Sequence, residues 1–232
     1  MAEKIISILS TRELKRELLE RDEFRHFNID VLPFIRIAPD ISPETAARIR
    51  TLSEQPIVAI FTSVNAVDAI KAHLQVKPQW RIFCIGGATK DKLEQALPES
   101  TIIATGKNGK ALAEKIRLHP EIKEVVFFCG NQRMNELPDL LKAGNVQVQD
   151  IVVYQTVQIP VDISKPYQGV MFFSPSAVHS FFSVNTLPIK TQLFSIGETT
   201  TNTIQSYCSN PVVTSPWPGE LNMLEMVADY YK

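Results

Sequence analysis

Small polar residues follow several short apolar runs of this sequence, and each set stands just before a stretch with helical periodicity. Residues of these types cap the amino ends of helices, where backbone N–H groups are free and the helix dipole is positive. Helix ends of this kind bind carboxylates and phosphates, so a row of them predicts a site for an anionic ligand. Capping alone accounts for any single set. The sets are Ser10–Thr11–Arg12, Thr62–Ser63, Gly86–Gly87, Thr105–Gly106, Gly130–Asn131, Ser174–Pro175–Ser176, Gly197 and Thr214–Ser215.

Common catalytic signatures are missing from the sequence. It contains no G-x-G-x-x-G and no G-x-S-x-G motif, and GKNGKA (106–111) lacks the spacing and the Ser or Thr of a P-loop. Its four histidines include no pair spaced i, i+4, the spacing that places two zinc ligands on one helix face. The sequence therefore disfavours metal and nucleotide chemistry.

The elements that carry the polar sets alternate between apolar strands and helices. PIVAIFTS (56–63) is followed by VNAVDAIKAHL (64–74), and GVMFFSPS (169–176) is followed by AVHSFF (177–182). Strands alternating with helices predict parallel βα units. Helices on both faces of a sheet also explain why these strands are apolar throughout.

An internal repeat runs through the chain. Phe172 follows Phe61 by 111 residues, and the same offset relates Gly197 to Gly86. Three matched segments in register indicate a duplication, and so long a period indicates two domains of one fold. The pairs are IFTSVNAV (60–67) with FFSPSAV (172–178), RIFCIGGATKDKL (81–93) with QLFSIGETTTNTI (192–204), and TIIATGKNGKAL (101–112) with PVVTSPWPGEL (211–221).

Two further strand–turn–helix segments stand outside the matched pairs, one at the start of the chain and one at 124–144. Two extended apolar segments ending at proline would connect the domains, pair antiparallel and act as a hinge. The alternative is one large domain with an incidental repeat. The predicted division is a continuous domain at 39–150, a discontinuous domain at 1–30 plus 165–232, and linker strands at 31–38 and 151–164.

Tyr154 is the conspicuous ionisable residue of the second linker strand, near the expected anion site. Tyrosine is common in strands, so packing within the strand is by propensity the stronger interpretation. The residues themselves leave both roles open.

Composition limits the classes of partner. The 232 residues are 44% hydrophobic and 21% charged, and the formal net charge of −1 gives no general basic footprint for nucleic acid. No apolar run approaches the ~20 residues of a membrane span, and the charged first segment is unlike a signal peptide. Cys84, Cys129 and Cys208 form an odd, scattered set, which predicts reduced thiols in a cytoplasmic protein.

VVFFCGNQRMNELPDLLKAGNVQVQDIVVYQT (125–156) resembles the most characteristic stretch of the uroporphyrinogen-III synthase family. IFTSVNAV, FFSPSAV, IGETT and TSPWPGEL resemble the family's other motifs in the right order, and STRELKRELLER…DVLPFIRI resembles its amino-terminal segment. The resemblance covers almost the whole chain. It implies an α/β fold of two similar small domains, HemD-like or flavodoxin-like. Each is a parallel sheet flanked by helices, and a two-stranded linker joins them.

The resemblance also implies an activity. The family closes the linear tetrapyrrole hydroxymethylbilane to uroporphyrinogen III, with loss of water and inversion of the last pyrrole ring through a spiro intermediate. It implies no metal, no organic cofactor and a monomeric enzyme. The acetate and propionate groups of the substrate suit a site built from helix amino ends. Tyr154 matches the tyrosine of the family's Y-x-T motif, the favoured proton donor to the leaving hydroxyl.

Further site residues follow from the same resemblance. Trp217 departs from the family, which often has a smaller polar residue there.

Two other functions remain open: a two-domain protein that binds an anionic small molecule without chemistry, and a receiver-like signalling module. A receiver needs an acidic cluster at its strand ends, where this sequence has Ser, Thr and Gly. The residues that match substrate-binding positions are Arg12, Ser63, Thr89, Asn131, Ser174, Ser176, Thr200 and Ser215.

Overall fold

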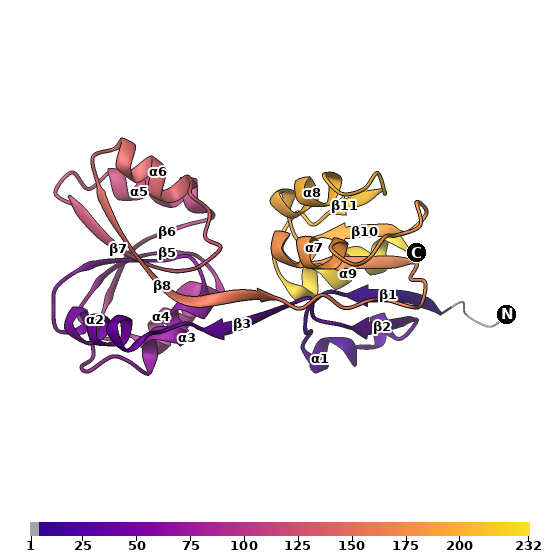
Figure 1. Ribbon diagram of the computed structural model, residues 1–232, viewed down its shortest axis with the longest axis horizontal. Coiled ribbons are helices and arrows are strands. Elements are labelled where there is room, and N and C mark those ends of the chain that lie inside the picture. Colours follow the sequence, from indigo (N-terminus) through magenta and orange to yellow (C-terminus); the bar gives the residue numbers. More distant parts are fainter. Residues whose placement is uncertain (1–4) are drawn as a thin grey trace. The chain divides into compact units, whose positions relative to one another are not determined.

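The computed structural model describes residues 5–232, in which strands and helices alternate along the chain (Figure 1). These residues form two compact units, one from the residues up to Arg36 together with Val157–Lys232, the other from Ile37–Thr156. The first four residues of the predicted discontinuous domain lie outside the described part. The assignment of these units to the two predicted domains, with the bounds given above, remains a prediction.

The first unit has a parallel sheet with the strand order β11–β10–β9–β1–β2. The helix expected after the first strand is only four residues long, because Lys15 supplies no capping side chain and no residue of that helix is buried. The elements are β1 (Ile6–Ser10), α1 (Arg16–Leu19), the 3₁₀ turn η1 (Asp22–Phe24), β2 (Phe27–Val31), β9 (Gly169–Phe172), α7 (Pro175–Phe182), β10 (Gln192–Ser195), α8 (Glu198–Gln205), β11 (Val212–Thr214) and α9 (Glu220–Tyr230).

The second sheet has the order β3–β8–β7–β4–β5–β6, and its strands from β8 to β6 are parallel. The elements are β3 (Ile35–Pro39), α2 (Pro43–Ser53), β4 (Val58–Phe61), α3 (Val64–Lys71), β5 (Arg81–Ile85), α4 (Ala88–Ala96), β6 (Thr101–Gly106), α5 (Gly109–Arg117), β7 (Glu124–Gly130), α6 (Glu136–Ala143) and β8 (Gln147–Gln158).

The strands β3 and β8 belong to the two segments predicted as linkers, and they lie side by side. The N–H of Asp40 donates to the carbonyl of Val153 at 3.2 Å, and the N–H of Ile159 donates to the carbonyl of Phe34 at 2.9 Å. As the residue number rises along one strand, the number of its partner falls along the other. This is the antiparallel pairing that the sequence predicted.

The two sheets share one strand order, read from different starting points. In the first, the pair β1–β2 precedes the triplet β9–β10–β11, giving β2–β1–β9–β10–β11. In the second, the pair β7–β8 follows the triplet β4–β5–β6, giving β8–β7–β4–β5–β6. Numbered in chain order, the first is the flavodoxin order 2-1-3-4-5 and the second is 5-4-1-2-3, the same spatial arrangement with the pair moved to the end of the chain. The second unit is thus a circular permutation of the first, and the triplets are the segments matched by the repeat.

Helices cover both faces of the second sheet, with α2, α3 and α4 on one face and α5 and α6 on the other (Figure 1). Neighbouring residues of β7 enter opposite cores: Phe128 packs on the α2–α4 face and Phe127 on the α5–α6 face. The ring of Phe128 is stacked with those of Phe61 and Trp80, at centroid distances of 5.1 and 5.4 Å. Burial on both faces accounts for the continuous apolar run of this strand.

The three cysteines are unpaired, as the sequence predicted. Burial raises the pKa of the Cys84 and Cys129 thiols to about 11. Among residues 5–232, no helix has both the length and the apolar character that a membrane crossing requires.

Candidate active site

In each unit, the polar residues singled out by the sequence lie in loops or first helical turns that follow the carboxyl ends of the strands. Neighbouring parallel strands place these loops along one edge of their sheet. The structure therefore brings the predicted residues together in two groups, one in each unit. The loops after β1, β9, β10 and β11 carry Arg12, Ser174 with Ser176, Thr200 and Ser215, and the loops after β4, β5 and β7 carry Ser63, Thr89 and Asn131.

The strand order of each sheet reverses at one point, between β1 and β9 in the first unit and between β7 and β4 in the second. Open parallel sheets bind ligands at such switch points, because the adjacent loops leave in opposite directions. Arg12 and Ser174 flank the first switch point, and Asn131 and Ser63 flank the second. Topology thus favours these four residues over the other predicted ones.

Ser63 and Ser174 cap the helices that follow them. The hydroxyl oxygen of Ser63 accepts from the N–H of Asn65, and that of Ser174 accepts from the N–H of Ala177, both at 3.2 Å. Both serines therefore act as helix N-caps, as the sequence predicted. Each hydroxyl also has a proton that it can donate to a ligand.

Replacing either serine by alanine is expected to lower the free energy of unfolding by about 0.5–2 kcal/mol, because α3 or α7 loses its N-cap. Urea unfolding followed by circular dichroism measures the change. Ser63→Asp is the matched control. Its carboxylate keeps the capping acceptor, so stability is expected to stay near that of the wild type, and its negative charge repels an anionic ligand. Wild-type stability in Ser63→Ala would show that the cap contributes nothing.

Thr89 and Thr200 are buried, with 6% and 2% of their surface exposed. Sequence reasoning missed the adjacent Thr201. Its hydroxyl lies 2.6 Å from that of Thr214 and contacts that of Ser195, at the carboxyl ends of β10 and β11. The hydroxyl cluster of this edge is therefore built on Thr201, next to the predicted Thr200.

Arg12 is half-exposed and forms an ion pair with Glu220, the first residue of α9, at 2.8 Å. A ligand carboxylate would have to compete with Glu220 for this guanidinium. Ser215 is buried, and its hydroxyl donates to the carbonyl of Trp217 at 2.6 Å. The side chain of Trp217, where the sequence departs from the family pattern, is 70% exposed. Ser176 lies in the first turn of α7.

Tyr154 lies in β8 where the pairing of this strand with β7 ends, and it is half-buried, with its side chain against the core formed by α2–α4. It also lines a cavity of about 230 Å³. Tyr154 therefore both packs against the core of its unit and lines a cavity. Two polar residues of this cavity, Asn65 and Asp68, were missed by sequence reasoning, and both lie on α3, the helix that Ser63 caps. The cavity is lined by Ile37, Pro39, Asn65, Asp68, Ala69 and Tyr154.

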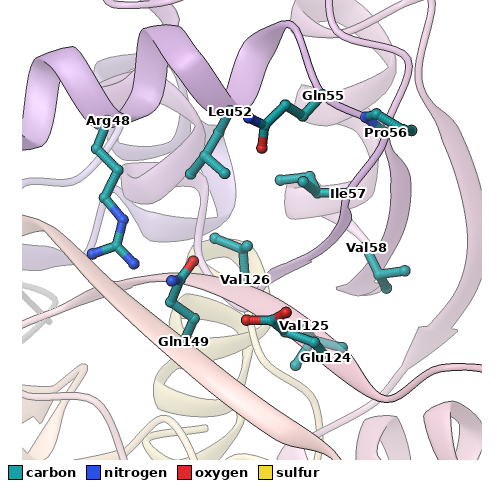
Figure 2. Close-up of a pocket in the computed structure, with 10 residues that line it drawn as sticks. All are labelled: Arg48, Leu52, Gln55, Pro56, Ile57, Val58, Glu124, Val125, Val126 and Gln149. Carbon is teal, nitrogen blue, oxygen red and sulfur yellow. The ribbon is translucent and has the colours of Figure 1, made fainter.

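A larger cavity of about 420 Å³ lies at the opposite edge of the same sheet (Figure 2). Val58 and Glu124, the first residues of β4 and β7, line it, and Figure 2 shows Arg48 reaching from α2 toward Gln149 on β8. Ligands of parallel sheets bind at the carboxyl ends of the strands, and this cavity lies at the amino ends. No predicted site residue lines it, so we place the candidate active site elsewhere.

Within the part of the chain that the structure describes, no group of three or more His, Cys, Asp or Glu side chains is placed to hold a metal ion.

Comparison with known proteins gives one consistent result. The family model described as uroporphyrinogen-III synthase HemD matches residues 16–225. A uroporphyrinogen-III synthetase from Helicobacter pylori has a similar structure, with a TM-score of 0.70 at 16% identity over 97% of this chain and 99% of that one. A mutant uroporphyrinogen III synthase from Thermus thermophilus gives a TM-score of 0.64 at 14% identity, over 98% of this chain and all of that one. At these identities the structural matches support the fold, and the family match covers most of the chain.

Proposed function

Because the chain belongs to the uroporphyrinogen-III synthase family, it is an enzyme of tetrapyrrole biosynthesis, and we propose that Tyr154 is its proton donor and that the carboxyl edges of its two sheets hold its substrate. The reaction closes hydroxymethylbilane to uroporphyrinogen III with loss of water and inversion of the terminal ring. Family membership favours this enzyme over a binding protein without chemistry.

The observation that carries the site assignment is the position of Arg12, Ser63, Asn131 and Ser174 at the two switch points. The substrate bears an acetate and a propionate on every ring. Helices begin directly after these loops, and their free N–H groups suit carboxylates. Backbone donors also explain how a chain of net charge −1 could bind a polyanion.

The proposed chemistry begins with proton transfer from the Tyr154 hydroxyl to the hydroxyl that leaves the substrate. Water departs and a resonance-stabilised azafulvene remains. The terminal ring then attacks through its substituted carbon, and the spiro intermediate fragments and recloses with the ring inverted. The proton released on final closure balances the one that Tyr154 supplied. Holding the chain so that the unsubstituted carbon cannot attack first is a matter of positioning.

The deciding experiment supplies hydroxymethylbilane to the purified protein and separates the type III from the type I product by chromatography. We expect mainly type III, at a rate unchanged by a metal chelator, because we propose that the reaction uses no metal and no organic cofactor. Formation of type I alone, at the rate seen in buffer, would remove the assignment.

We also propose that the enzyme is a cytoplasmic monomer without nucleic-acid or membrane partners. Unpaired cysteines support a reducing compartment, and the formal net charge of −1 argues against nucleic acid. Light scattering on the preparation used for the assay tests the monomer, and a dimer mass would contradict it.

A further inference from the structure

The pairing of β7 with β8 changes beside Tyr154. The strands pair residue by residue as far as Cys129 with Val152, but Gly130 then pairs with Tyr154. Val153 is thus an extra residue on β8, which makes this step a β-bulge. Bulges re-aim the side chains that follow them, so the direction of Tyr154 depends on this one.

Side chains of β8 alternate between the two cores before the bulge. Val148 faces α5 and α6, whereas Ile151 and Val153 face α2–α4. Strict alternation would send Tyr154 to the side of Val148, because a shift of one residue changes the face of every side chain after it. The bulge instead places Tyr154 on the α2–α4 face, where it lines the cavity with Asn65.

Gly130 makes room for the Tyr154 ring. A Cβ atom at Gly130 would lie 2.5 Å from Cε2 and Cζ of Tyr154 and 2.9 Å from its hydroxyl oxygen. These distances are too short for any real contact, so a side chain here would displace the ring. The glycines with positive φ are Gly87 and Gly219. Gly130 is therefore needed for space and not for its backbone conformation.

Asn131 fixes β8 at Tyr154 and two residues beyond it. Its N–H donates to the carbonyl of Tyr154 at 3.1 Å, and its side-chain Oδ1 accepts from the N–H of Thr156 at 2.9 Å. Gln132 adds a bond from its side-chain Nε2 to the carbonyl of Thr156 at 3.2 Å. The side chain of Asn131 thus replaces a backbone acceptor where β7 ends.

We propose that Gly130 and Asn131 are positioning residues that fix the Tyr154 hydroxyl for proton transfer. The inference rests on the proposed role of Tyr154. Gly130 acts by leaving the space that the ring occupies, and Asn131 acts by holding the backbone on which the ring is carried. Asn131 Oδ1 is thus bound within the protein, a role that differs from direct substrate binding.

The test is a double-mutant cycle with kcat, KM and unfolding free energy measured for each variant. Gly130→Ala and Asn131→Ala are made in the wild-type enzyme and again in Tyr154→Phe. In the wild type, each is expected to lower kcat by ~10- to 100-fold with KM within about twofold, because small displacements of a catalytic group cost this much. In Tyr154→Phe, neither is expected to lower kcat further, since the hydroxyl they position is gone. Asn131→Asp keeps the Oδ acceptor and is expected to recover part of the kcat lost in Asn131→Ala.

Gly169→Ala is the matched control for crowding. Gly169 is the first residue of β9, so it lies away from the carboxyl edge. A Cβ atom at Gly169 would lie 2.7 Å from Cδ1 of Ile8. It is expected to lower stability while leaving kcat of the folded enzyme unchanged in both backgrounds. If Gly130→Ala fails to fold, Asn131→Ala and Asn131→Asp complete the same cycle.

Equal losses of kcat in the two backgrounds would overturn the proposal, because the effect would then not pass through the Tyr154 hydroxyl. A failure of the proposed function has a different signature. If Tyr154→Phe alone keeps wild-type kcat, the proton-donor role is wrong and this inference falls with it. If the wild type makes no type III product, the assigned reaction itself is wrong.

Discussion

Trp80→Ala is expected to lower the free energy of unfolding by about 3–5 kcal/mol, the range for removing a buried aromatic side chain. Trp80 is fully buried and stacks on Phe128 at 5.4 Å. Its indole N–H also donates to the carbonyl of Leu52, at the end of α2, at 3.0 Å. Alanine would leave a cavity beside the sheet and remove that donor. Urea unfolding followed by far-ultraviolet circular dichroism measures the loss.

The chain's other tryptophan supplies the control. Trp217 is 70% exposed, so Trp217→Ala is expected to change stability by no more than about 0.5 kcal/mol, as surface substitutions usually do. Trp80→Phe is expected to lose less stability than Trp80→Ala, because it keeps one aromatic ring for the stack and loses the indole donor together with the second ring. A loss below about 1 kcal/mol in Trp80→Ala would show that the Phe61–Phe128–Trp80 stack is not central to this core.

Sequence was sufficient for the fold class because the signals that define it are local. The run ending at Phe61 is apolar and the helix after it begins at a serine cap, and the same holds for the run ending at Phe172. These local signals recur at a constant offset, so the duplication was visible without any knowledge of strand pairing. The polar character of the carboxyl edges followed from the same capping residues.

Features that depend on distant parts of the chain could not be predicted. The circular permutation depends on which parallel strands are neighbours in each sheet, and the alternation of strands and helices does not specify those neighbours. Glu220 meets Arg12 from 208 residues away. Side-chain direction within a helix was also hard to predict: sequence reasoning singled out Thr200 and missed Thr201, because adjacent helical residues point about 100° apart. Tyr154 has the same difficulty, since only the bulge at Val153 shows which face it occupies.

Tyr154→Phe is expected to lower kcat by ~100-fold or less, with little change in KM. The proposed proton transfer strengthens only as the hydroxyl departs, so its loss affects the transition state more than substrate binding. General-acid help is typically worth ~10²–10⁴-fold. We expect the low end or less, because a hydroxymethyl group on an electron-rich pyrrole leaves readily and a phenol is a weak acid.

The structure makes this substitution a clean probe of chemistry. Within residues 5–232, the Tyr154 hydroxyl makes no hydrogen bond to the protein, and its ring packs on the α2–α4 core. Phenylalanine keeps that packing, so stability is expected to change by no more than about 0.5 kcal/mol. Tyr207→Phe is the control: Tyr207 is 46% exposed and bonded to His179, and its replacement is expected to leave kcat unchanged.

The product of Tyr154→Phe is expected to remain type III, because ring inversion depends on how the bound substrate is held, and that survives the loss of one hydroxyl. Chromatography of the products alongside kcat separates two ways in which the assignment could fail. Wild-type kcat in the phenylalanine variant would make Tyr154 a packing residue of its strand. Release of the type I isomer, or of unrearranged intermediate, would show that Tyr154 controls the geometry of ring closure and not the transfer of a proton.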